Sequence, residues 1–110
     1  MAMLERTLNG NFDDIVDAVH NGILSGSASA SYEDGSNFSM GDVQVAVRMY
    51  ERYSMSGGNR VAMSVTFVGQ ADRVHITAIT AGGSQGMFFK LNTFGEESFL
   101  DTLAVFLDRL

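Results

Sequence analysis

The order in which residue periodicities follow one another constrains this chain most. Apolar residues recur at helical spacing in residues 11–24, alternate with polar residues over 27–78, and return to helical spacing over 93–110. Alternating strands present one sheet face to a core, and only these two helices are available to cover it. The pattern predicts an α+β fold in which a four- to five-stranded antiparallel sheet carries two helices on one face, in the order β-α-β-β-β-β-α.

Length and composition indicate a single domain spanning residues 1–110. With 45% hydrophobic residues, a chain of 110 residues can build one core but not two. It has no cysteine, which excludes disulfides, zinc–thiolate sites and thiol catalysis and suits a reducing compartment. No stretch has the roughly 18 apolar residues of a membrane span, and no basic segment precedes an apolar run. We therefore expect a cytoplasmic protein with no membrane contact.

Capping signals place the start of both helices. Asn11 is expected to be the N-cap of the first, with Asp13 and Asp14 in its first turn, where the helix dipole favours anions. Thr93 and Glu96 have the spacing of a capping box, so the second helix is expected to begin there. Its apolar stripe should face the sheet through Phe99, Leu100, Leu103, Phe106, Leu107 and Leu110.

Alternation places the strands. Residues 4–8 form a short first strand, and 27–33 either a strand of small residues, ending in a turn at 34–37, or a low-complexity linker; we favour the strand. Residues 61–67 and 74–78 alternate again after short glycine- or Asp-containing turns. The longest strand lies between, and its expected core face consists of Val43, Val45, Val47, Met49, Tyr53 and Met55. Its expected polar face consists of Gln44, Arg48, Tyr50 and Arg52.

Parity predicts the strand registers, because opposed residues of an antiparallel pair point to the same face. Pairing Met55 with Val61 keeps apolar residues together and requires a loop with an odd number of residues around the Ser-Gly-Gly-Asn stretch at 56–59. Pairing Phe67 with Val74 likewise places apolar residues opposite each other, and the loop between these two strands is then 70–71. These registers predict one cross-strand row of polar residues on the open face: Tyr50, Thr66 and His75.

The segment 87–92, Met-Phe-Phe-Lys-Leu-Asn, is compatible with either a short extra strand or a packed loop. The overall order of elements resembles that of the TATA-binding-protein-like and helix-grip folds, the latter including lipid-carrying and plant-allergen-like domains. Residues 84–97, with the sequence SQGMFFKLNTFGEE, also look like the C-terminal part of a family of small uncharacterised bacterial proteins. Neither resemblance implies catalytic residues, and a shared fold does not assign a function.

Motifs of catalysis and metal binding are weak in this chain. Residues 82–86 match G-x-S-x-G, but a nucleophile elbow needs a helix directly after the serine, so we interpret the glycines as a turn, with a phosphate-binding nest as the lesser alternative. His20 is expected to cap the first helix near its C-terminus. Paired acids at 13–14 and 96–97 fit helix starts better than acid–base chemistry. We expect no metal, no cofactor and no catalytic residue.

Charge is the feature that points to a surface. The net charge of −6 argues against nucleic-acid binding, yet four of the seven cationic residues are expected on the polar sheet face: Arg48, Arg52, Arg60 and Arg73. Long arginine side chains on a solvated face are the simplest interpretation. The functional interpretation is a binding face that consists of Arg48, Tyr50, Arg52, Thr66, Arg73 and His75.

These observations rank three functions. We favour a non-enzymatic binding or self-association module, with a homodimer or a small-molecule ligand as partner of the open sheet face. The alternative is a carrier of a small apolar ligand between the sheet and the C-terminal helix, which would need a cavity lined by Met49, Met63, Phe67, Met87, Phe88 and Phe106. The third is a small enzyme that uses Tyr50, Thr66 and His75.

Overall fold

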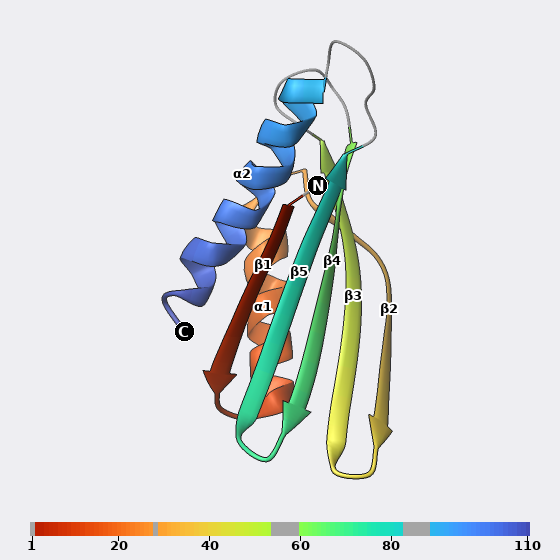
Figure 1. Cartoon of the computed structure of the whole chain (residues 1–110), viewed down its shortest axis with the longest axis vertical. Helices are drawn as coiled ribbons and strands as arrows, with labels where there is room; N and C mark the ends of the chain where they lie inside the picture. The colour runs from red at the N-terminus through yellow and green to blue at the C-terminus, as the bar shows by residue number, and fades with distance from the viewer. Residues whose placement is uncertain (1, 28, 54–59, 83–88) are drawn as a thin grey trace.

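The computed structural model describes residues 2–27, 29–53, 60–82 and 89–110 (Figure 1). In chain order the elements are β1 (Ala2–Asn9), α1 (Phe12–Gly26), β2 (Ser31–Met40), β3 (Val43–Tyr53), β4 (Arg60–Gln70), β5 (Arg73–Gly82) and α2 (Phe89–Leu107). The strands form one sheet in the order β1-β5-β4-β3-β2, and every neighbouring pair is antiparallel. This confirms the predicted α+β fold and its element order.

One core fills the space between the helices and the sheet. It consists of Ile15, Val16, Val19 and Ile23 of α1, Ala46, Tyr50, Val61, Met63, Val65, Phe67, Val74, Ile76 and Ala78 of the sheet, and Phe99, Leu100, Leu103 and Leu107 of α2. The helices also pack on each other, because the ring of Phe106 lies over Gly22, where a Cβ atom would come within 2.7 Å of it. Figure 1 shows α1 behind the strands, so the opposite face of the sheet faces the viewer.

The start of α1 follows the sequence signal. The side chain of Asn11 accepts a hydrogen bond from the amide of Asp14 at 3.0 Å, which satisfies one of the free amides of the first turn. Asp13 and Asp14 lie in that turn. The predicted N-cap is confirmed.

The start of α2 differs from the prediction. The helix begins at Phe89, so Thr93 lies inside it and is not its N-cap. The residues before Thr93 include Lys90 and Leu91, which favour helices, and no glycine or proline interrupts them. Residues 89–92 are thus helical rather than a strand or loop, whereas 87 and 88 lie outside the described residues. At the other end, Leu110 is 54% exposed and does not join the apolar stripe.

The strand predicted at 27–33 and the turn predicted at 34–37 are both misplaced. β2 runs through that turn, and the chain reverses at Gly41 and Asp42, where Met40 pairs with Val43. Gly41 has a φ of 61°, which glycine adopts without strain. Polar residues are tolerated in β2 because every one of its residues is exposed, and a bulge after Tyr32 adjusts the register.

The faces of β3 are the reverse of those predicted. Tyr50 pairs with Met63 and is fully buried, whereas Met49 points away from the helices and is 37% exposed. The cause is the length of the connection to β4. Tyr53 pairs with Arg60, which leaves six residues between them instead of the odd number expected, and a change of parity turns every side chain of a strand to the other face.

The faces of β4 and β5 agree with the prediction, but their register does not. Phe67 pairs with Ile76 rather than with Val74, and the turn is Ala71–Asp72 instead of 70–71. A shift of two residues preserves the side-chain faces, which is why the core positions of both strands were still predicted correctly. Outside the described residues lie the predicted turn at 56–59 and residues 83–86 of the G-x-S-x-G string.

Candidate functional site

The six residues of the predicted binding face lie on opposite sides of the sheet. The helix side holds Arg48, Tyr50 and Arg52. The outer side holds Thr66, Arg73 and His75. The predicted row of Tyr50, Thr66 and His75 is therefore wrong. The basic character expected of that face is also divided, since the guanidinium of Arg52 lies 4.4 Å from the ring centre of Phe99 in α2.

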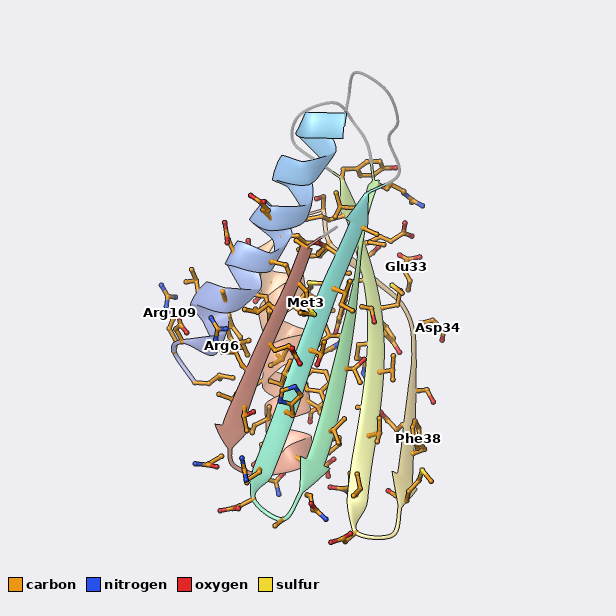
Figure 2. All side chains as sticks on the ribbon, viewed as in Figure 1. Met3, Arg6, Glu33, Asp34, Phe38 and Arg109 are labelled. Carbon is orange, nitrogen blue, oxygen red and sulfur yellow. The ribbon has the colours of Figure 1, made fainter. Side chains whose placement is uncertain are left out.

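The outer sheet face carries an apolar patch instead, which we define as Phe38, Met40, Val43, Val45, Val47, Met49 and Val68. The patch extends over β2, β3 and β4. Phe38, Met40 and Val68 are 48%, 71% and 39% exposed. Apolar side chains that remain this exposed to water add little to the stability of an isolated monomer. Figure 2 shows Phe38 on β2, at the edge of the sheet.

One cross-strand row shows how the outer face changes character. The register places in line Phe38, Val45, Val68, His75 and Thr7. The first three are apolar, and the last two belong to a polar network. Along this row the outer face changes from apolar residues on β2, β3 and β4 to polar residues on β5 and β1, whereas nearer the other end of those two strands Met3 and Ile79 are apolar and exposed.

The polar network joins a hydroxyl, an imidazole and a carboxylate. Nδ1 of His75 lies 2.9 Å from Oγ1 of Thr7, and Nε2 lies 2.9 Å from Oε2 of Glu5, which also accepts from the hydroxyl of Thr77 at 3.3 Å. The hydrogen bond with His75 holds the pKa of Glu5 below its usual range. These groups satisfy one another on an exposed face, so we interpret the network as a stabilising surface feature rather than as a catalytic site.

On the helix side, His20 has a different role from the one predicted. Its Nδ1 lies 2.7 Å from the hydroxyl of Tyr50, and its ring meets that of Tyr32 edge-on with centroids 5.1 Å apart. Burial raises the pKa of Tyr50, while the nearby charge of Arg48 acts in the opposite direction. No sequence pattern indicated this cluster, because it joins α1, β2 and β3 at positions that depend on the register of two strands.

The cavity that a carrier would need is not formed by the residues proposed for it. Met63 and Phe67 are fully buried on the helix side, but Met49 lies on the outer face of the sheet. Phe106 packs over Gly22 of α1. Met87 and Phe88 lie outside the described residues.

Two further features, a metal site and a membrane-spanning helix, were sought in the part of the chain that the structure describes. No group of three histidine or acidic side chains there is placed to hold a metal ion. Nor does that part contain a helix long and apolar enough to cross a membrane.

Among the residues that the structure describes, helices cover only one side of the antiparallel sheet, and this arrangement defines a small α+β domain. The chain belongs to a family of unknown function, DUF6054, which matches residues 1–110. A comparison with curated proteins gives no match.

Proposed function

We propose that this domain is a non-enzymatic self-association module and that two copies meet through the apolar patch of the outer sheet face. The observation that carries the proposal is the orientation of β3, which buries Ala46 and Tyr50 and leaves its row of valines and Met49 facing outward. Burial of such a row is favoured by about 25 cal/mol for each Å² removed from water. Burial of these outward side chains against a partner surface would therefore stabilise the complex.

Charge in the apolar patch does not oppose contact with a second copy of this chain. With a net charge of −6, two copies repel each other over most of their surfaces. The apolar patch contains no charged residue, so it offers an approach with little repulsion. At one end of the face, Arg60 is already paired with Glu51 at 3.5 Å. Self-association also fits the preference of small proteins for two-fold symmetric contacts in which one patch meets itself.

The size of the face agrees with a dimer contact. Five strands spaced by about 4.8 Å, with an average length of 10 residues, present roughly 800 Å² per copy. Stable interfaces bury about 800 Å² on each partner. The apolar patch would form the centre of such an interface and the polar network its rim. The absence of cysteine is consistent with this function in the cytoplasm.

Analytical ultracentrifugation of two matched variants tests the proposal. Val68→Lys places a charge in the apolar patch, and Val105→Lys places the same charge on α2, where the valine is 52% exposed. We expect a wild-type dimer with a Kd near 10 µM or below, about −7 kcal/mol of association free energy. An unpaired lysine at the centre of the interface should cost about 3 kcal/mol, or roughly a hundredfold in Kd.

The control variant decides how the result is interpreted. Val105→Lys should leave the dimer intact, because α2 lies on the other side of the sheet. A wild-type protein that remains monomeric at about ten times that Kd contradicts the proposal. Equal weakening by the two lysines would also contradict it, since the contact would then depend on overall charge and not on the outer face.

A further inference from the structure

A second surface lies on the helix side of the sheet, in a cleft between α1 and strands β2 and β3. Its volume is about 430 Å³, which is enough for a small metabolite. We call it the edge cleft and define it by the polar residues that line it: Asp13 and Asp17 of α1, and Asn37, Ser39, Gln44 and Arg48 of the strands. Its polar lining lies on the helix side of the sheet, and Phe38 and Val45, which belong to the apolar patch, also border it.

Packing at the start of α1 explains why the cleft is open. Phe12 lies against Gly69 of β4, where no larger residue would leave room for its ring. This contact holds the helix over the middle of the sheet. β2 meets α1 through the ring contact of Tyr32 with His20, and all of its residues are exposed. One side of α1 consequently faces the uncovered part of β2 and β3 across the cleft.

The two walls of the cleft have opposite charges. Asp13 and Asp17 are four residues apart, so both carboxylates lie on the same side of α1. Opposite them, Nη1 of Arg48 donates to the carbonyl oxygens of Val47 at 2.9 Å and Ser36 at 3.3 Å, which fixes the position of the guanidinium. Among the described residues, neither aspartate makes an ion pair, and Arg48 pairs with no carboxylate.

We propose that the edge cleft binds a small zwitterion, a molecule of the amino-acid type with an ammonium group at one end and a carboxylate at the other. The ammonium group is held by Asp13 and Asp17, and the carboxylate by Arg48, with the amides of Asn37 and Gln44 as further hydrogen-bonding partners. A simple cation would meet the charge of Arg48, and a simple anion would meet two aspartates. Only a ligand that carries both charges matches both walls.

Titration of the amide resonances with 4-aminobutyrate, bracketed by glycine and 6-aminohexanoate, tests the proposal. Butylamine and butyrate serve as probes with one charge each. We expect saturable shifts in residues 13–17 and 44–48 with at least one of the three amino acids, and affinity at least about tenfold lower for the two single-charge probes. Saturation by butylamine with equal affinity would overturn the proposal, as would the absence of saturable shifts with all three amino acids.

A pair of variants in one helical turn provides the control. Asp13→Asn and Asp14→Asn remove the same charge from the first turn of α1, but Asp14 lies on the side of the helix near Leu110 and not in the edge cleft. Asp13→Asn and Arg48→Gln should each weaken binding of the amino acid at least about tenfold, and Asp14→Asn less than about twofold. Equal effects of Asp13→Asn and Asp14→Asn would show that only net charge matters and would refute the site.

Discussion

Two tyrosines of β3 offer the sharpest test of how the sheet is oriented. Tyr50 is fully buried between the helices and the sheet, whereas Tyr53 is 52% exposed on the outer face. They are the same residue type in the same strand, so strand propensity is matched; Tyr53 is the last residue of β3 and Tyr50 lies three residues inside it. Replacing each by alanine compares a buried with an exposed position in a single element.

The expected losses differ severalfold. Tyr50→Ala removes a buried ring and leaves a cavity, which should lower the free energy of unfolding by about 3 to 5 kcal/mol. Tyr53→Ala removes a surface ring whose main contact is the guanidinium of Arg60, 5.5 Å from the ring centre, and should cost at most about 1 kcal/mol. Tyr50→Phe keeps the ring and deletes the hydroxyl bonded to His20, which should cost about 1 kcal/mol and lower Tm by about 5 °C.

Urea denaturation followed by circular dichroism measures all three variants. A double-mutant cycle that combines Tyr50→Phe with His20→Leu should give a coupling energy of about 1 kcal/mol if the two side chains share a hydrogen bond. Equal losses for Tyr50→Ala and Tyr53→Ala would refute the orientation of β3. The proposed apolar patch would then be refuted too, because the valines of β3 would face the core.

Three further predictions concern local interactions. Asn11→Ala should cost about 1 kcal/mol and Asn11→Asp much less, because aspartate can still cap the helix; equal losses in urea denaturation would contradict the cap. Thr93→Ala should raise stability by up to about 0.7 kcal/mol, because Thr93 lies inside a helix that begins at Phe89, whereas a loss of about 1 kcal/mol would restore it as the N-cap. Folding lowers the pKa of Glu5, so its ionised carboxylate contributes to the free energy of unfolding. This stabilisation is fully present above the unfolded-state pKa and is lost as the pH falls through the lowered pKa of the folded protein. An NMR titration of His75→Gln should show the pKa of Glu5 moving back up, and an unchanged pKa would exclude the hydrogen bond as its cause.

Local signals were sufficient for much of the fold. The cap at Asn11 and the spacing of apolar residues after it predicted α1, and alternation predicted which residues of β4 and β5 face the core. Each of these signals operates within one element, so it needs no knowledge of the strand partner. A register shift of two residues between β4 and β5 left their faces unchanged for the same reason.

Features that depend on competing local signals were predicted less well. Residues 34–37 have the composition of a turn, but Gly41 and Asp42 form the turn instead, because a glycine at a φ of 61° suits a two-residue hairpin. Thr93 has the spacing of a capping box, but the helix continues through it. In each case the chain offers two acceptable positions for one boundary, and pairing or packing elsewhere selects between them.

The strand β3 shows why the candidate site was the least predictable part. Hydrophobicity alone favours burying its valines. The structure instead buries Tyr50, whose hydroxyl has a partner in His20, and turns Arg52 to the helix side, where it lies over Phe99. Those partners belong to helices far away in the sequence, so alternation within the strand could not indicate them. Where the local pattern of a sequence conflicts with its fold, the conflict mostly lies at positions that serve function. The outward valines are such a conflict, and a second copy that covers them would resolve it.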